Sequence, residues 1–332
     1  MSRRLAAAGA ATLALVLSAC GGDAGEEPEG GTASPSPTTS ATPAVETAPA
    51  VEVGAGPVGV TAQGDDAVWV VVSGDDQVVR IPASATEPDL EVAIPGTPLR
   101  AVAAYGAVWV TSFRGERVLR VDQATGKVTD RIATGAGPEG VTAGFGSLWL
   151  VEQDAGTLAR IDPDTRRIVD RVDIGVGARL VLAGSDALYV AQFRDDRVLR
   201  VDPRTLAVRR SPKVCTGPQG MAQAGGSVWV ACTFSDEVVA LAPDTLEPGA
   251  RTEVSGLPDS VVAVGNRVLV VAEEGPRLVV LDAATGELVS EQALGDDVAL
   301  YDNANLDLDV SAGEVWISSF SADRVHHVPL PG

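Results

Sequence analysis

The chain has 332 residues, of which 45% are hydrophobic and 21% charged, and its 45 aspartates and glutamates outnumber its 25 lysines and arginines. The resulting net charge of −20 leaves the sequence without a basic patch. An acidic body of this kind argues against nucleic acid or an anionic lipid surface as a partner.

The first residues have the features of an export signal. Met1-Ser2-Arg3-Arg4 is basic, and the apolar run from Leu5 to Leu17 that follows is shorter than the about 20 residues that a membrane-spanning helix needs. We therefore expect a signal peptide over residues 1–19. Leu17-Ser18-Ala19-Cys20 resembles the lipobox of bacterial lipoproteins, which implies lipidation of Cys20 and a lipid anchor on the outer side of the cell membrane. The alternative is an ordinary signal peptide in which Cys20 is incidental.

A change of composition follows the cysteine. Residues 20–48 are rich in Gly, Ser, Thr, Pro, Ala and Glu and have no apolar pattern to bury. Such a stretch cannot offset the entropy lost on ordering, so it is predicted to be a flexible linker. The remaining residues, 49–332, are predicted to form a single repeat array.

One short apolar phrase recurs along that array, with a central aromatic residue in every copy except the one at Leu269. Its central residues are Trp69, Trp109, Trp149, Tyr189, Trp229, Leu269 and Trp316. The step is 40 residues for the first six copies and 47 for the last, so the seventh copy carries an insertion. A fixed period of this length indicates stacked supersecondary units that bury a continuous core.

Each repeat contains four short runs rich in β-branched residues, separated by Gly, Pro or Asp. Those residues are typical of strands and tight turns, and no helical periodicity follows the signal peptide. The fold class is therefore predicted to be all-β, a seven-bladed β-propeller of four-stranded blades. The seventh copy lacks its fourth strand, and Pro49–Gly54 matches the fourth-strand pattern. An N-terminal strand is thus expected to complete the last blade and close the ring.

The repeats resemble YVTN and NHL propellers, and most closely the virginiamycin B (streptogramin) lyase-like propellers. The matching phrases are Gly137-Pro138-Glu139-Gly140-Val141, Gly217-Pro218-Gln219-Gly220-Met221 and Leu148-Trp149-Leu150-Val151-Glu152. The resemblance implies the fold, and for the lyases a catalytic histidine with metal-binding carboxylates on one face. Here no histidine occupies the matching positions, and only Glu152 falls where that family places a glutamate. The lyase's catalytic set therefore does not transfer.

Two kinds of loop meet on one face of an up-and-down blade: those leading into the first strand and those leaving the second. They carry aromatic, arginine and carboxylate side chains, which suit recognition of a ligand or partner. The candidate binding residues are Arg100, Phe113, Arg114, Glu139, Glu152, Arg179, Phe193, Arg194, Gln219 and Asp259. Ordinary loop chemistry, with partly buried phenylalanines at the blade ends, is the alternative.

Two further features belong to that face. Cys215 and Cys232 form an isolated pair, which usually bonds in an exported protein, although two free buried thiols are the alternative. The insertion in the seventh repeat brings Asp307 and Asp309, which are weak metal candidates because the glycine and glutamate of a calcium loop are missing. A solvated bulge is preferred there, so no cofactor is expected, and a divalent cation is the alternative.

These patterns together favour a membrane-anchored extracytoplasmic lipoprotein. Its propeller is expected to act without catalysis, as a monomer that binds an envelope protein, a polysaccharide or a small ligand. The alternatives are a streptogramin-lyase-like or hydrolytic enzyme that uses carboxylates or a metal on the same face, and a structural envelope protein.

Overall fold

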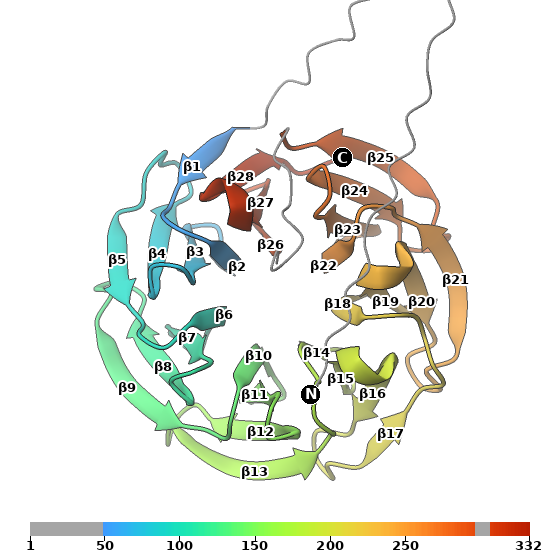
Figure 1. Ribbon diagram of the computed structural model, residues 1–332, viewed down its shortest axis with the longest axis horizontal. Coiled ribbons are helices and arrows are strands. Elements are labelled where there is room, and N and C mark those ends of the chain that lie inside the picture. Colours follow the sequence, from blue (N-terminus) through green and yellow to red (C-terminus); the bar gives the residue numbers. More distant parts are fainter. Residues whose placement is uncertain (1–48, 296–305) are drawn as a thin grey trace, which may run out of the picture. The chain divides into compact units, whose positions relative to one another are not determined.

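The computed structural model describes residues 49–295 and 306–332, which fold into seven four-stranded antiparallel sheets. Figure 1 shows the sheets set radially, with the first strand of each blade nearest the centre and the fourth at the rim. The all-β, seven-bladed propeller predicted from the repeats is thus confirmed. In these residues no helix has the length and apolar character required to cross a membrane.

The blades follow one another along the chain. Blade 1 comprises β2 (Pro57–Gln63), β3 (Ala67–Val72), β4 (Gln77–Pro82) and β5 (Leu90–Ala93). Blade 2 comprises β6 (Pro98–Ala104), β7 (Ala107–Ser112), β8 (Arg117–Asp122) and β9 (Val128–Ala133). Blade 3 comprises β10 (Pro138–Gly144), β11 (Ser147–Glu152), β12 (Thr157–Asp162) and β13 (Arg167–Asp173). Blade 4 comprises β14 (Val181–Ala183), β15 (Leu188–Gln192), β16 (Arg197–Val201) and β17 (Val208–Arg210).

The last three blades continue the series. Blade 5 comprises β18 (Pro218–Ala224), β19 (Ser227–Cys232), β20 (Glu237–Leu241) and β21 (Pro248–Glu253). Blade 6 comprises β22 (Pro258–Val264), β23 (Arg267–Ala272), β24 (Arg277–Asp282) and β25 (Leu288–Ala293). Blade 7 comprises β26 (Leu308–Ser311), β27 (Glu314–Ser319), β28 (Arg324–Pro329) and β1 (Ala50–Glu52). Three 3₁₀ turns follow second strands: η1 (Phe193–Asp195), η2 (Thr233–Ser235) and η3 (Phe320–Ala322).

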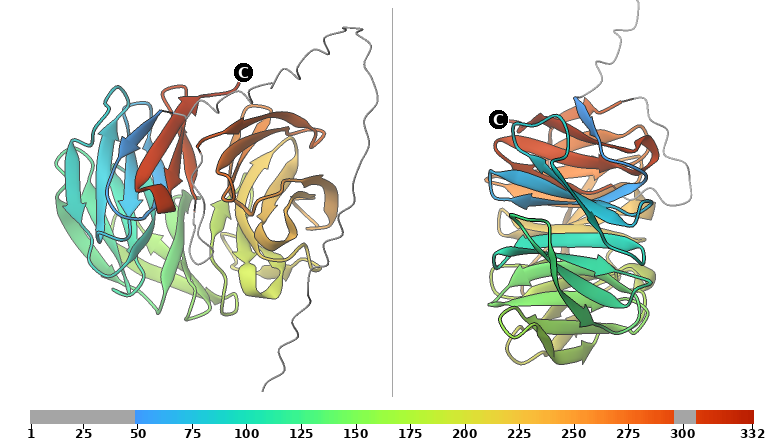
Figure 2. Two further views of the ribbon diagram at one scale, coloured as in Figure 1. Left: turned by 45° about the horizontal axis from the view of Figure 1, so that its top comes forward. Right: turned by 90° about the vertical axis from the view of Figure 1, so that its left-hand side faces the viewer.

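The N-terminal strand closes the ring as predicted. β1 pairs with β28, with Val51 opposite Val325, and Figure 2 shows the two strands side by side. Val51 is buried with Val325 among residues of blade 1, so the closing strand contributes to the core as well as to the sheet. The edge of β28 that an incomplete seventh blade would leave unpaired is thereby covered by one short rim strand.

The recurring aromatic residue explains the 40-residue step. Trp109 packs against Leu148 and Leu150 of the following blade, and Trp149 packs against Leu188 and Val190 in the same way. The five tryptophans and Tyr189 are almost completely buried. Six blades therefore place one large ring between themselves and a neighbouring blade, Leu269 takes this position in blade 6, and the repeats share a continuous core.

A cation covers the ring in several blades. The guanidinium carbon of Arg120 lies 5.6 Å from the centre of the Trp109 ring, and that of Arg160 lies 5.5 Å from the Trp149 ring. In blade 7 the equivalent residue is His327, whose ring stacks on Trp316 at 4.9 Å. Its Nδ1 lies 3.0 Å from Glu314 Oε2, so this histidine is part of the blade packing.

The two faces of the propeller differ in their connections. We call the face with the loops into the first strands and out of the second strands the upper face. The lower face carries the turns between strands 1 and 2 and between strands 3 and 4. In the 3–4 turn of blade 3, Asp162 Oδ1 accepts hydrogen bonds from the backbone N–H groups of Asp164 at 3.0 Å and Thr165 at 2.7 Å.

Candidate functional site

The upper face is held by a contact that recurs in four successive blades. The last residue of the second strand reaches back to the linker that leads into its own blade, two elements that lie about 17 residues apart. The non-covalent contacts are Ser112 Oγ to Pro95 O at 2.7 Å, Gly135 N to Glu152 Oε1 at 2.7 Å and Gln192 Nε2 to Ile174 O at 2.6 Å. We call these contacts the linker tethers.

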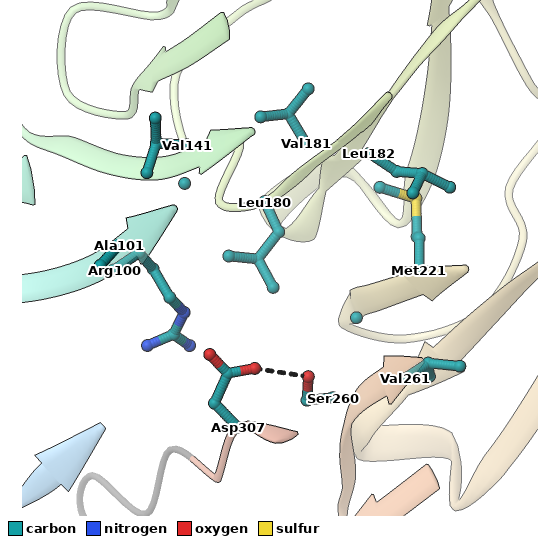
Figure 3. Close-up of a pocket in the computed structure, with 12 residues that line it drawn as sticks. Arg100, Ala101, Val141, Leu180, Val181, Leu182, Met221, Ser260, Val261 and Asp307 are labelled. Carbon is teal, nitrogen blue, oxygen red and sulfur yellow. Dashed lines mark hydrogen bonds between the residues drawn. The ribbon is translucent and has the colours of Figure 1, made fainter. Parts of the chain in front are cut away.

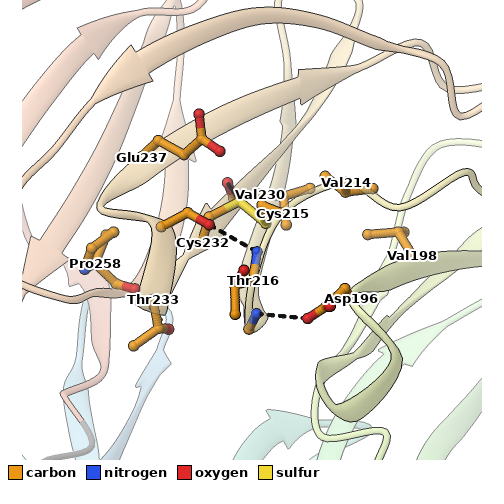
Figure 4. The surroundings of a disulfide bond; sticks show 12 residues. Asp196, Val198, Val214, Cys215, Thr216, Val230, Cys232, Thr233, Glu237 and Pro258 are labelled. Carbon is orange, nitrogen blue, oxygen red and sulfur yellow. Dashed lines mark hydrogen bonds between the residues drawn. A yellow bond between two sulfur atoms is a disulfide. The ribbon is translucent and has the colours of Figure 1, made fainter.

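In blade 5 the linker tether is covalent. Cys215 and Cys232 form a disulfide with a Cα–Cα distance of 5.8 Å, as predicted (Figure 4). The bridge joins the linker to the end of β19, immediately before η2. It therefore fixes two segments of the upper-face surface relative to each other.

Glu152, one of the predicted binding residues, is fully buried at 0% exposure and belongs to a tether. Besides Gly135 N–H, it receives a hydrogen bond from Thr157 Oγ1 and a bidentate one from Arg171 at 2.8 and 3.0 Å. Burial raises the pKa of Glu152, but these donors outweigh it and hold the pKa below its usual value. Its position beneath the surface gives it a role in supporting the linker.

Four of the predicted residues form one hydrogen-bonded chain across blades 3 to 6, which we call the polar chain. Arg179 Nε donates to Glu139 Oε1 at 2.9 Å, and Arg179 Nη1 donates to Gln219 Oε1 at 2.6 Å. Gln219 Nε2 then donates to Asp259 Oδ1. Each link joins side chains 40 residues apart, so it bridges neighbouring blades. Glu139, Gln219 and Asp259 are buried.

The charged residues of the polar chain change one another's pKa values. Burial lowers the pKa of Arg179, but the negative charges of Glu139 and Asp259 outweigh burial and raise it overall. At the other end, Asp259 is hydrogen-bonded to Glu273, and burial next to that carboxylate raises the pKa of Glu273 to about 10. Glu273 is therefore protonated at neutral pH and shares its proton with Asp259, whose own pKa is also raised by burial.

An open groove lies beside the polar chain, between the upper-face loops of blades 3, 4 and 5. We call it the aromatic groove; its volume is ≈ 460 Å³. It is lined by Gln153, Asp154, Val176, Gly177, Phe193, Arg194, Asp196, Thr216, Gly217 and Phe234. Phe193 and Phe234 meet edge to face with their ring centres 5.5 Å apart, and Phe234 is 61% exposed and Val176 50%. Because these exposed apolar side chains lie together in one groove, they form a candidate binding surface.

The polar chain and the disulfide both support this groove. The guanidinium carbon of Arg179 lies 4.9 Å from the centre of the Phe193 ring, which fixes the ring by a cation–π contact. Gly217 passes so close beneath the rings that a Cβ there would lie 3.0 Å from Phe234 and 3.2 Å from Phe193, and its φ of 69° also favours glycine. Gly217 lies two residues after Cys215, so the disulfide anchors the chain next to the groove floor.

Three of the other predicted residues, Phe113, Arg114 and Arg100, do not line the groove. Phe113 and Arg114 belong to the upper-face loop after β7, where Phe113 is half-buried and Arg114 exposed. Arg100 is buried at the start of β6 and faces the central channel. Arg194 lines the groove together with Phe193.

Neither weak metal candidate has the surroundings of a metal site. Asp307 accepts hydrogen bonds from Ser260 Oγ at 2.7 Å and Val60 N at 3.1 Å, and Asp309 accepts one from Ala62 N at 2.8 Å. Burial raises the pKa of Asp309. Across residues 49–295 and 306–332, no three His, Cys, Asp or Glu side chains are grouped so that they would hold a metal ion.

Sequence reasoning missed Val176, Thr216 and the exposed position of Phe234, all of which line the groove. The 40-residue alignment itself contained a usable signal. It aligns Glu152 with Cys232. A position that forms a disulfide in one blade is expected to hold the same linker in another blade. That signal would have moved Glu152 from the binding residues to the supporting ones.

No family model matches the chain, and no curated protein does. Among solved structures, a streptogramin B lyase superposes with a TM-score of 0.71 at 15% identity, covering 84% of this chain and 95% of the lyase. The virginiamycin B lyase from Staphylococcus aureus gives 0.71 at 15% identity, over 85% of this chain and 99% of that one. BamB from Moraxella catarrhalis gives 0.59 at 18% identity, over 83% of each chain. At these identities the likeness is one of fold, and at that level it agrees with the resemblance to streptogramin lyase-like propellers.

Proposed function

We propose that this chain is a membrane-anchored extracytoplasmic lipoprotein whose propeller binds a protein or another envelope ligand without catalysis. The aromatic groove carries the proposal, because it combines exposed aromatic area with a frame that is already rigid. Rings whose positions are fixed before binding lose little conformational entropy when a partner contacts them. Aromatic anchors of this kind supply most of the binding energy at interfaces.

The groove's charged residues suit orientation of a partner. Arg194 and Asp154 line it from different loops, and Asp196 is held by Lys213 at 3.0 Å. Charges at the edge of an apolar contact mainly set the register and the association rate. Opposed charges around exposed rings therefore fit a partner segment with an apolar or aromatic side chain between polar ones.

The hydrogen bonds that the upper-face carboxylates form within the protein support binding over catalysis. Glu139 and Asp259 are buried and bonded within the polar chain, and Glu152 is bonded within a tether. A general acid or base must reach a substrate proton within hydrogen-bond distance. Within the described upper face, these three carboxylates serve the frame of the groove.

The lipid anchor rests on Leu17-Ser18-Ala19-Cys20, which lies outside the described residues. Its test is the Cys20→Ala variant, compared with wild type by membrane fractionation and by mass spectrometry of the mature N-terminus. The variant should lose its membrane association or remain an unprocessed precursor. A mature wild-type chain that begins elsewhere and carries no lipid would refute the anchor.

The groove is tested by capture from envelope extract with a matched pair of variants. Phe234 is 61% exposed in the groove, and Leu288 is 57% exposed on β25 at the rim of blade 6. Phe234→Ala should reduce capture of the bound species at least about tenfold, the effect of losing 1.4 kcal/mol. Leu288→Ala removes a similar exposed apolar side chain elsewhere and should leave capture unchanged. Equal loss in both variants would place the binding surface outside the groove.

A further inference from the structure

The centre of the propeller contains a second cavity, distinct from the aromatic groove. An inner chamber of ≈ 130 Å³ lies between the innermost strands and shares lining residues with an outer chamber of ≈ 610 Å³. The outer chamber is lined by Gly184 and Ser185 of the 1–2 turn in blade 4, so it opens toward the lower face. The inner chamber's apolar wall consists of Val141, Leu180, Val181, Leu182, Met221 and Val261 (Figure 3).

A positive charge faces the inner chamber. Arg100 is only 6% exposed, and its Nη1 donates to Val58 O at 2.7 Å and Leu99 O at 3.0 Å. In the part of the chain that the structure describes, its Nε and Nη2 form no hydrogen bond. Figure 3 shows the guanidinium directed into the chamber. This guanidinium edge borders the chamber, and its geometry matches a carboxylate.

A negative charge faces Arg100 from the other side of the chamber, since the Asp307 carboxylate points toward the guanidinium in Figure 3. Asp307 Oδ1 accepts from Ser260 Oγ at 2.7 Å and Leu308 N at 3.0 Å, and Oδ2 accepts from Val60 N at 3.1 Å. A carboxylate oxygen has two lone-pair sites, so Oδ2 has room for one more donor. Asp307 is half-buried and reaches the cavity.

The neighbouring carboxylates do not satisfy Arg100. Asp259 is close enough for its pKa to be lowered by the charge of Arg100, although burial has the larger, opposite effect. Its oxygens accept from Gln219 Nε2 and Leu306 N. Arg100 and Asp307 are thus the two charged groups that remain directed at the chamber.

These two charges define the ligand class. A simple anion attracted by Arg100 would be repelled by Asp307. A simple cation attracted by Asp307 would be repelled by Arg100. We propose that the channel binds a small zwitterion, an α-amino acid with an aliphatic side chain. Its carboxylate pairs with the Nε–Nη2 edge of Arg100, its ammonium donates to Asp307, and its side chain packs against Leu180 and Met221. Entry is from the lower face, through the outer chamber.

The experiment measures binding to the purified full-length chain by isothermal titration calorimetry, with L-leucine as the probe. N-acetyl-L-leucine removes the ammonium, L-leucinamide removes the carboxylate, and glycine removes the aliphatic side chain. We expect L-leucine to bind with a measurable dissociation constant and each analogue to bind at least about tenfold more weakly. No heat with L-leucine at millimolar concentration, or binding of either singly charged analogue as tight as that of L-leucine, would overturn the proposal.

Variants locate the site. Arg100→Gln should weaken L-leucine binding at least about tenfold, the loss expected for a charge-assisted pair. Arg204→Gln alters an exposed arginine on a lower-face turn and should leave binding unchanged.

If Arg100→Gln fails to fold, the analogue series on the wild-type chain still decides the ligand class. Unchanged binding in a folded Arg100→Gln variant would also contradict the proposal. Since Phe234 lies outside the channel, Phe234→Ala should retain L-leucine binding, which separates this site from the aromatic groove.

Discussion

The lower and upper faces of the propeller differ in the contacts that hold the connections between their strands. On the lower face, four 3–4 turns use one device, an aspartate that accepts from the backbone two and three residues further on. These aspartates are Asp122, Asp162, Asp202 and Asp282. On the upper face, four successive blades use four different residues for the linker tether: Ser112, Glu152, Gln192 and Cys232.

The difference follows from what each contact requires. A tight turn prescribes its backbone angles, and few side chains other than aspartate satisfy its N–H groups, so the same residue recurs. A tether must only join two segments that already lie close together, so a hydroxyl, a carboxylate, an amide and a disulfide all suffice. The face whose chemistry is free to vary between blades is also the face that carries the aromatic groove.

The largest effect is expected from the covalent tether. The Cys215→Ser/Cys232→Ser double variant releases a loop of 17 residues, which should cost roughly 3 kcal/mol in the chain-entropy model. Thermal denaturation followed by circular dichroism should show a loss of several degrees. Cys215→Gly/Cys232→Gln installs the tether of blade 4 in blade 5 and should recover part of that loss. If the second variant is no more stable than the first, the four tethers are not equivalent.

The second-largest loss of stability is expected from the buried carboxylate tether formed by Glu152. Glu152→Ala leaves the half-buried Gly135 N–H without its acceptor and Arg171 without its partner, at a cost of roughly 2 kcal/mol. Glu152→Gln keeps an acceptor for Gly135 and should lose less. The measurement is the urea midpoint of each variant, and equal midpoints for Glu152→Ala and wild type would show that this tether carries no stability.

The carboxyl pair should make the upper face sensitive to alkali. The folded protein raises the pKa of Glu273 from 4.5 to about 10, so the native state binds more protons than the unfolded state between those values. Stability contributed through this group therefore falls as pH rises across that window. Glu273→Gln cannot ionise and should flatten the decline of melting temperature between pH 7 and pH 9. A variant with the same pH profile as wild type would contradict the shared proton.

The smallest effect is expected on the lower face. Hydrogen bonds from Thr165 and Asp164 lower the pKa of Asp162, so they stabilise the turn above the unfolded pKa, and this stabilisation is lost as pH falls through the folded pKa. Asp162→Ala should reduce the melting temperature slightly at neutral pH and leave capture by the aromatic groove unchanged. The difference from wild type should vanish in acid. A loss larger than that of Glu152→Ala would reverse the ranking of the two faces.

The fold was predictable because its signals are local and repeated. The 40-residue step, the Asp-containing turns and the missing fourth strand of the last copy each follow from packing or turn geometry that every blade shares. The disulfide was predictable for a related reason, since Cys215 and Cys232 fall on the same face of one blade.

Within the candidate site, the placement of the predicted residues on one face followed from the repeat, but the depth of each side chain did not. The innermost strands of several blades contain a bulge near their start, as between Pro138 and Val141. A bulge interrupts the alternation of side chains along a strand, so the direction of Glu139 cannot be read from spacing. The same applies to Asp259, which lies beside the register shift that follows Pro258 and is fully buried. Phe193, in the less regular η1 turn, remained exposed to the groove.

The pairing of β1 with β28 has a consequence for the order in which the chain folds. Blades 1 to 6 consist of consecutive strands, so each can form as soon as its own residues are free to pair. Blade 7 needs Val51 and Val325 together, and these lie at opposite ends of the propeller sequence. Closing so long a loop is slow compared with pairing neighbouring strands. Because the chain is synthesised from its N-terminus, β1 stays unpaired until β28 has been made. The ring is completed only then.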